Sequence, residues 1–222
     1  MFTASSKVWI AFVHGESTVN ADFAWSLACN ANTLGDRLAG VIHASGAQQL
    51  VLRNDLIRFF LGKEDDWLLW WDTDMELPET AALDLLEAAE QAKAQMATCL
   101  GFMWRNDVLG DGTMVPVPNA FRYNIQDGEY EYIWDYQPDQ AQWVDATGLG
   151  FTLVHRKAFE GMGEPWHVND QFGHDMNFCW RLGLGKVLYC TQIKSRHMKT
   201  IGIDEPLYRA AVAKLWPQGQ ES

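Results

Sequence analysis

Short apolar runs alternate with longer amphipathic segments along the first half of the chain. The runs are rich in aromatic and β-branched residues and predict buried strands over 7–13, 38–43, 67–71 and 96–103. Between them, apolar residues at helical spacing predict helices over 21–34, over 48–61, and from Pro78 to about residue 93. This alternation predicts an α/β fold, with a Rossmann-like, mostly parallel sheet covered by helices on both faces.

The second half has a less regular pattern. Alternating residues over 121–134 surround Asp127-Gly128 and predict a hairpin. Further expected elements are a strand, glycine-rich turn and strand over 143–155, a helix over 175–182, a strand over 186–190 and a final helix over 207–215. We therefore expect a small antiparallel subregion here. Without a Pro/Ser-rich linker or a repeat, residues 1–222 are interpreted as one domain with halves of about 1–104 and 105–222.

Two carboxylates directly follow the most apolar run. Asp72-Thr73-Asp74 comes straight after the five residues WLLWW, at the carboxyl end of a predicted strand, where open α/β sheets bind ligands. Alternate residues of an extended segment point the same way, so Asp72 and Asp74 can converge on one ligand. Carboxylate oxygens suit Mg²⁺ or Mn²⁺ held together with a diphosphate. An acidic turn without a ligand is the alternative.

Several motifs occur in a recognisable order. They are Arg53-Asn54 within 52–57, the Asp72-Thr73-Asp74 triplet, the glycine turn and strand over 148–154, Pro165-Trp166, the segment 174–179, and a late histidine, His197. Together they cover most of the chain and resemble family-2-like GT-A glycosyltransferases, of the short single-domain type encoded by bacteria and phages. The resemblance implies the GT-A variant of the fold, with a nucleotide-sugar-binding first half and an acceptor-binding, catalytic second half.

On the donor side, the resemblance implies a nucleotide-diphosphate sugar, expected to be a UDP-sugar, and a divalent Mn²⁺ or Mg²⁺ ion. The implied nucleotide-sugar-binding residues are His14, Arg53, Asn54, Asp72, Thr73, Asp74 and Lys199. The implied metal ligands are Asp72, Asp74 and His197, an imidazole being a good ligand for Mn²⁺. An ordinary loop position for His14 and an exposed helix position for Arg53 and Asn54 remain open alternatives.

On the acceptor side, Asp175 corresponds to the family's catalytic acidic residue. The N-terminus of a helix favours the ionised form of a carboxylate, and an ionised carboxylate can take the proton of an attacking hydroxyl. His174 stands where glutamate is usual in the family, and Asp170 is the fallback base. Acceptor or sugar contacts are expected from Gly148, Gly150, Trp166 and His174, with turn and core roles as the alternatives.

Composition narrows the partners. No apolar run approaches the roughly 18 residues that span a bilayer, and the first residues lack the order of a secretory signal, so we expect a cytoplasmic protein, in the host cytoplasm if phage-encoded. The four cysteines have no metal-site spacing and are expected to be free thiols. The net charge of −12 disfavours a nucleic-acid partner. Residues 181–200, however, contain five basic and no acidic residues, a potential basic wall.

The sequence therefore predicts a metal-dependent glycosyltransferase that moves a sugar from a nucleotide-diphosphate sugar to a hydroxyl acceptor. A saccharide, a protein side chain and a hydroxymethylated base of phage DNA all remain open as acceptors. The alternatives from other functional classes are a nucleotidyltransferase acting on a sugar phosphate and a non-catalytic nucleotide-sugar-binding protein.

Overall fold

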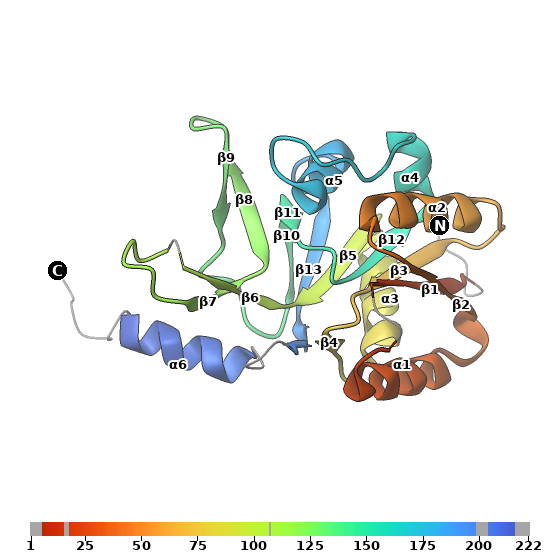
Figure 1. Cartoon of the computed structure of the whole chain (residues 1–222), viewed down its shortest axis with the longest axis horizontal. Helices are drawn as coiled ribbons and strands as arrows, with labels where there is room; N and C mark the ends of the chain where they lie inside the picture. The colour runs from red at the N-terminus through yellow and green to blue at the C-terminus, as the bar shows by residue number, and fades with distance from the viewer. Residues whose placement is uncertain (1–5, 16–17, 107, 199–203, 216–222) are drawn as a thin grey trace.

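A seven-stranded mixed sheet forms the centre of the computed structural model, which describes residues 6–15, 18–106, 108–198 and 204–215 (Figure 1). The strand order is β10-β13-β5-β12-β3-β1-β2. The pairs β1/β2, β1/β3 and β5/β13 are parallel, whereas β12 and β10 run antiparallel to their neighbours. The bounds of the sheet strands are Val8–His14 (β1), Leu38–Ser45 (β2), Trp67–Trp71 (β3), Met96–Leu100 (β5), Ala141–Val144 (β10), Phe151–His155 (β12) and Val187–Lys194 (β13).

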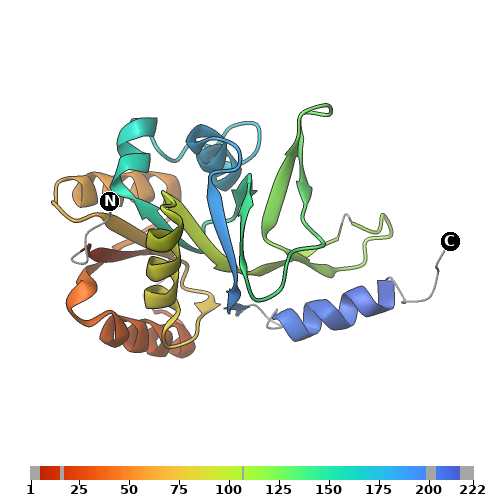
Figure 2. The same cartoon turned by 180° about the vertical axis from the view of Figure 1, so that it is seen from behind.

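Helices cover both faces of this sheet, as the alternating pattern predicts. Helices α1 and α3 lie on one face, with α2 and α4 on the other (Figures 1 and 2). The helix bounds are Ala21–Leu34 (α1), Gln49–Leu61 (α2), Ala81–Ala92 (α3), Arg156–Met162 (α4), His174–Leu182 (α5) and Glu205–Leu215 (α6), with a short 3₁₀ turn η1 over Gly35–Arg37. The α/β class with helices on both faces is therefore observed, in a sheet that is mixed.

Strand β3 illustrates how the two layers are built. All five of its residues are buried, and successive side chains point to opposite faces. Leu68 and Trp70 pack with α2 and α4, whereas Trp67, Leu69 and Trp71 pack with α1 and α3. The strand is apolar throughout because both of its faces are covered.

The second half contains several short antiparallel strands. Strands β8 (Ala120–Asn124) and β9 (Glu129–Tyr132) form the expected hairpin, and β11 (Ala146–Thr147) pairs with β8. The hairpin stands away from the central sheet in Figure 1. The second half also returns to the central sheet, because β10, β12 and β13 all belong to it.

Several boundaries differ from the sequence-based expectation. The run 96–103 is two strands, β5 and β6 (Phe102–Arg105), with Gly101 between them, and β6 pairs with β7 (Val115–Pro118). Helix α3 begins at Ala81, three residues after Pro78, because Asn30 of α1 accepts a hydrogen bond from the amide of Ala82 and caps the first turn there. Helix α4 and the two-residue strands β4 (Met75–Glu76) and β14 (Arg196–His197) were not expected.

Two further observations concern the cysteines and the helices. All four cysteines lie within the described residues, and all are free thiols, three of them buried. Within the described ranges, no helix is both long and apolar enough to cross a membrane.

Truncating a side chain at the centre of β3 should destabilise the folded protein. We expect Leu69→Ala to lower the free energy of unfolding by about 2–5 kcal/mol, because the side chain is fully buried and the two layers around it can close the cavity only in part. Val51→Ala, at a half-exposed position on α2, is the matched control and should change it by about 0.5 kcal/mol or less. Urea denaturation of both variants measures this, and equal midpoints would contradict the two-layer core.

Candidate active site

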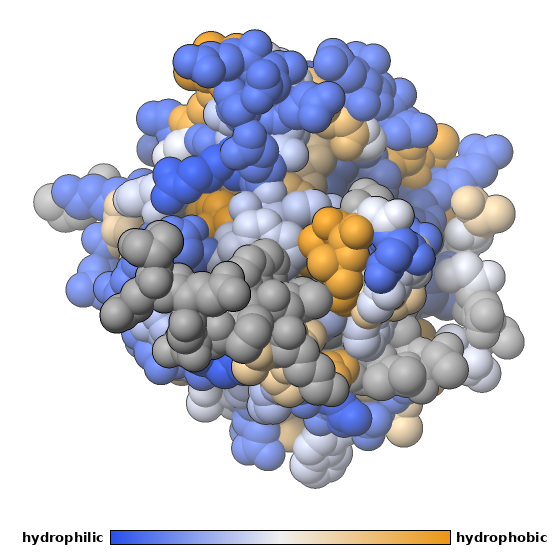
Figure 3. All heavy atoms as spheres, turned by 90° about the vertical axis from the view of Figure 1, so that its left-hand side faces the viewer, coloured by the Kyte–Doolittle hydropathy of each residue, from blue (hydrophilic) through white to orange (hydrophobic). Residues whose placement is uncertain are grey.

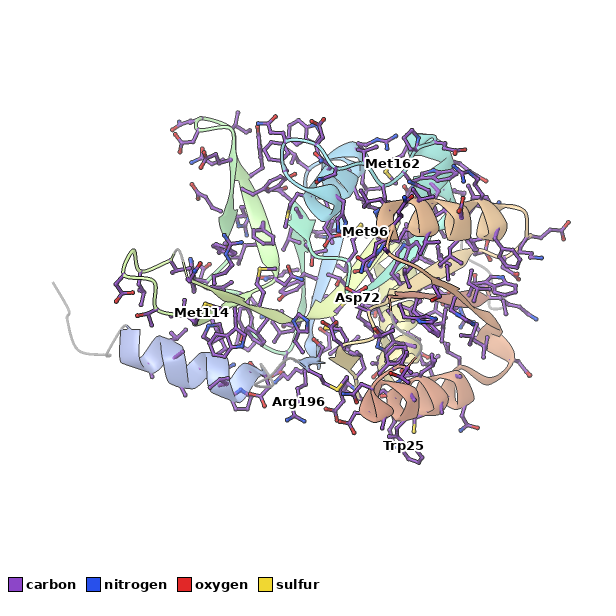
Figure 4. The ribbon with its side chains drawn as sticks, viewed as in Figure 1. Trp25, Asp72, Met96, Met114, Met162 and Arg196 are labelled. Carbon is purple, nitrogen blue, oxygen red and sulfur yellow. The ribbon has the colours of Figure 1, made fainter. Side chains whose placement is uncertain are left out.

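A cavity of about 140 Å³ lies where β3 and β5 end and β12 begins. Polar side chains reach it from four separate parts of the chain: Asp72 after β3, Asn119 between β7 and β8, Asp175 on α5, and His197 on β14. Figure 4 shows Asp72 at the centre of the molecule. The cavity therefore lies outside the carboxyl ends of parallel strands, the usual position of a ligand in an open α/β sheet.

Three hydrogen bonds fix the turn that carries the two aspartates. The amide of Met75 donates to the carbonyl of Asp72 at 3.1 Å, which closes the turn around Thr73 and Asp74. The indole Nε1 of the buried Trp71 donates to the carbonyl of Met75 at 3.0 Å, and the Asp72 amide donates to the carbonyl of Gly150 at 2.6 Å. The position of the turn is thus set by β3 on one side and by the start of β12 on the other.

Arg53 of α2 is paired with Asp72. Its Nη2 lies 2.6 Å from Asp72 Oδ1, and its guanidinium stacks over the ring of Trp70 at 5.0 Å. Arg53 is buried, whereas the Asp72 side chain is 42% exposed toward the cavity. The Nε and Nη1 atoms of Arg53 have no hydrogen-bond partner among the described residues. The pair thus brings a cation with unused donors to the base of a carboxylate site.

Loss of hydration and the neighbouring charges together set the pKa of Asp72, and Arg53 has the largest effect among the charges. Desolvation by the surrounding protein raises the pKa of Asp72 most, and the charges of Asp175 and Asp74 raise it as well. The Arg53 guanidinium and His197 act in the opposite direction, but the pKa of Asp72 remains above its ordinary value. Crowded carboxylates of this kind favour a cation or a proton between them.

Asp74 is joined to His197 by a contact that spans 123 residues of sequence. The pairing of β4 with β14 places His197 opposite Met75, and His197 Nε2 lies 2.8 Å from Asp74 Oδ2. The amide of Met198 also donates to the carbonyl of Asp74 at 2.7 Å. Two of the three expected metal ligands are therefore in direct contact.

Within the described ranges, however, no three His, Cys, Asp or Glu side chains form a ready-made metal site. Asp72 Oδ1 is engaged by Arg53, and Asp74 Oδ2 is engaged by His197. The donor chemistry nevertheless fits a divalent cation, because an imidazole nitrogen and a carboxylate oxygen that already share a proton can share an ion instead.

Asp175 enters the cavity from the first turn of α5. Its Oδ2 accepts a hydrogen bond from the amide of Leu149 at 3.3 Å, and its Oδ1 lies 2.6 Å from His174 Nδ1. Burial raises the pKa of Asp175, but the contact with His174 and the charges of Arg53, His174 and His167 outweigh that effect and hold the pKa below its ordinary value. The carboxylate is therefore ionised at neutral pH and able to accept a proton.

The glycine turn before β12 forms one wall of the cavity. A Cβ atom at Gly148 would lie 2.3 Å from the side-chain amide of Asn119, and one at Gly150 would lie 3.5 Å from Asp72 Oδ2. Both positions line the cavity. A side chain at Gly148 would thus displace the Asn119 side chain, whereas one at Gly150 would be in ordinary van der Waals contact with Asp72.

Other residues expected from the motifs have different surroundings. The Asn54 side chain accepts hydrogen bonds from the amides of Trp166 and His167 and donates to the carbonyl of His167, so it clamps the loop between α4 and α5. Trp166 is buried in the core, and its Nε1 donates to the carbonyl of Phe159. Neither residue lines the cavity, because each is directed into the packing of α2 against the second half.

The remaining expected residues lie around the donor side or outside the described ranges. His14, at the end of β1, is not a cavity residue, and its Nε2 lies 3.2 Å from Nδ1 of His43 at the end of β2. Thr73 is the partly exposed centre of the aspartate turn. Lys199 falls outside the described residues.

Asn119 was missed by the sequence interpretation. Its Oδ1 accepts a hydrogen bond from the amide of Gly148 at 3.0 Å, and its carbonyl accepts one from the Thr147 hydroxyl at 2.7 Å. The dipeptide Pro118-Asn119 signals a turn, but a turn signal does not say which distant segment the turn approaches.

Three basic side chains of the segment 181–198 are engaged in hydrogen bonds or ion pairs. Arg181 donates to the backbone carbonyls of Met162, at the end of α4, and of Gly163, in the loop that follows. Lys194 is paired with Asp139 and Glu205, and Arg196 with Glu76. Arg181 and Lys194 therefore link parts of the second half, and Arg196 links the second half to β4 of the first half.

Comparison with known proteins identifies the fold and goes no further. No protein-family model and no curated protein matches the sequence. Among solved structures, the chain is similar to A197 from STIV, with a TM-score of 0.61 and 17% sequence identity, over 86% of this chain and 85% of that chain. A likeness at this level of identity shows a shared mixed α/β architecture.

Removing the cation that faces Asp72 should make its ionisation harder. We expect Arg53→Met to raise the pKa of Asp72 further, since burial and the neighbouring carboxylates would then lack their main counter-charge. An acid whose pKa is higher in the folded than in the unfolded state binds its proton more tightly when folded, so its ionisation opposes folding. The free energy of unfolding of the variant should therefore fall as the pH rises from the ordinary pKa of an aspartate to the folded-state pKa of Asp72.

Carboxyl ¹³C NMR titration and denaturation at several pH values measure both effects. Arg58→Met, on the exposed face of the same helix, is the matched control. An unchanged Asp72 titration in Arg53→Met would contradict the assigned electrostatic role.

Proposed function

We propose that this protein is a metal-dependent glycosyltransferase of the GT-A type, which transfers a sugar from a nucleotide-diphosphate sugar to a hydroxyl group. One observation carries the proposal: carboxylates from both halves of the chain, Asp72 after β3 and Asp175 on α5, line one cavity at the carboxyl edge of the sheet, with Asp74 next to Asp72 in the same turn. Asp72 and Asp74 suit a diphosphate with its cation, and Asp175 suits a nucleophilic hydroxyl.

The donor is held on the side of the aspartate turn. Asp74 and His197 would hold the divalent ion, Mn²⁺ or Mg²⁺, with Asp72 beside them, and the bound ion would neutralise charge on the departing diphosphate. Arg53 places a positive charge and two unpartnered guanidinium nitrogens, Nε and Nη1, behind the same site. The cavity of about 140 Å³ suits the sugar end of the donor, and the nucleoside would extend toward His14 at the end of β1.

Asp175 is the group that activates the acceptor when the transfer inverts the anomeric centre. The acceptor oxygen forms a bond to the anomeric carbon, its proton passes to Asp175, and the bond to the diphosphate oxygen breaks with its electron pair. The contact with His174 and the hydrogen bond from Leu149 orient the carboxylate for this step. The configuration of the product, read by ¹H NMR, distinguishes this route from a retaining one.

The first test is donor binding. We expect one class among UDP-, GDP-, CDP- and TDP-sugars to raise the melting temperature in the presence of Mn²⁺, since a ligand that binds the folded state stabilises it by mass action. Asp74→Ala should lose this stabilisation, and Asp36→Asn, an exposed aspartate on η1, should keep it. If none of the four classes of nucleotide-sugar raises the melting temperature at millimolar concentration, the proposed function is wrong.

The second test separates donor binding from catalysis. We expect Asp175→Asn to bind the donor as the wild type does and to lose about 10²–10⁴-fold in transfer rate, the range of a general base. Product analysis decides between rival classes. Release of a nucleoside diphosphate from a nucleotide-sugar supports transfer of the sugar, whereas pyrophosphate released from a nucleoside triphosphate and a sugar phosphate would mean a nucleotidyltransferase. Donor binding without turnover in the wild type would mean a binding protein.

A further inference from the structure

A second and larger cavity lies between the β8–β9 hairpin and the loop that leads into α5. Its volume is about 470 Å³, within the range typical of small-molecule sites. The apolar part of its lining comes from Phe121, Tyr130, Phe172 and two methionines, and the polar part from Arg105, Glu129 and Gln171. We refer to these residues as the hairpin cleft.

The hairpin cleft adjoins the central cavity. Met103 of β6 lines both cavities. On α5, Asp175 lines the central cavity and the next residue, Met176, lines the hairpin cleft. The carboxylate that accepts a proton in the proposed reaction therefore lies at the junction of the two, where an acceptor in the cleft would present a hydroxyl group.

Aromatic rings form the walls of the cleft. The rings of Tyr130 and Phe172 lie 5.2 Å apart and nearly perpendicular, and Tyr123 packs against both. The Tyr130 hydroxyl has no hydrogen-bond partner among the described residues. Flat apolar faces with a few polar groups at their rim match a pyranose ring, which has apolar C–H faces and hydroxyl groups around its edge.

The charges around the cleft disfavour a polyanion. The cleft itself holds one cation, Arg105, and one carboxylate, Glu129. The hairpin from 120 to 132 adds Asp127 and Glu131 against Arg122, which leaves a net negative charge there. Hydrophilic atoms dominate this side of the molecule, with apolar patches among them (Figure 3). Nucleic-acid binding depends on Lys and Arg facing phosphates, and Arg181, Lys194 and Arg196 already have partners within the chain, in the case of Lys194 and Arg196 acidic ones.

We propose that the acceptor is an uncharged saccharide, one ring of which lies in the hairpin cleft against Tyr130 and Phe172 with a hydroxyl group directed to Asp175. This inference rests on the proposed glycosyl transfer. Of the three candidate acceptors, saccharide, protein side chain and DNA base, it selects the saccharide. Tyr130 and Phe172 would determine acceptor affinity without contributing to donor binding.

Acceptor binding and transfer test it together. The probes are methyl α- and β-glycosides of glucose, galactose, mannose and N-acetylglucosamine. Their binding is followed by saturation-transfer NMR with and without UDP and Mn²⁺, and sugar transfer to them is measured with the nucleotide-sugar that raises the melting temperature in the donor screen. Short hydroxymethylated duplex DNA is the competing acceptor. We expect at least one glycoside to bind and accept sugar, and Phe172→Ala to raise its KM about tenfold or more with the donor dissociation constant unchanged.

Matched variants guard against a folding effect. Phe172→Leu keeps most of the apolar volume and should lie between Phe172→Ala and the wild type, and Trp25→Ala, at a surface tryptophan of α1 (Figure 4), should leave KM unchanged. Salt-sensitive transfer to DNA with no glycoside accepted, or a glycoside KM indifferent to Phe172→Ala, would overturn the cleft assignment. Absent donor binding would instead overturn the proposed function, and glycoside binding by NMR would still test the cleft.

Discussion

The burial of β3 between two layers of side chains is the constraint on which the candidate site depends. Every residue of Trp67–Trp71 is enclosed, and alternate side chains belong to different layers. A slip of one residue would exchange the two sets, so the register of the strand is strongly specified. Asp72 therefore leaves the sheet at one defined point, where its amide is bonded to Gly150 at the start of β12.

The crowding of carboxylates follows from that point of exit. Asp72 and Asp74 are neighbours in one turn, and the start of α5 brings Asp175 against the same cavity, so each negative charge raises the cost of ionising Asp72. The positive charge of Arg53, which stacks on the ring of Trp70, lowers this cost. Such an arrangement is unfavourable for stability taken alone, and it becomes favourable when a cation or an incoming hydroxyl proton is present.

The second half closes this site and extends it. Strands β12 and β13 return to the central sheet, so the glycine turn and His197 reach the cavity from rigid elements. The hairpin and α5 lie beyond it and form the adjoining cleft, which places the proposed donor and acceptor chemistry side by side. The likeness to A197 from STIV at 17% identity shows that this mixed α/β architecture is retained where few residues are shared.

Much of the architecture was predictable because local patterns report local structure. Apolar runs and helical spacing identified β1, α1, β2, α2 and β3 almost to the residue. Two-residue strands such as β4 and β14 carry no periodicity, and α3 begins late because a side chain of α1 caps it. The antiparallel insertion of β12 between β3 and β5 is a matter of long-range pairing, about which a strand's own pattern says nothing.

For the site, the sequence alone determined that two carboxylates follow a buried strand and that Asp175 begins a helix. Tertiary structure decided which side chains share the cavity. Asn54 and Trp166 support the α4–α5 loop instead of lining the cavity. The sequence does not show this, because a residue type does not reveal which way its side chain points once its helix or loop is packed. Tertiary structure also brought Asn119 to Gly148 and His197 to Asp74, since contacts between segments far apart in sequence exist only after the strands that carry them have paired.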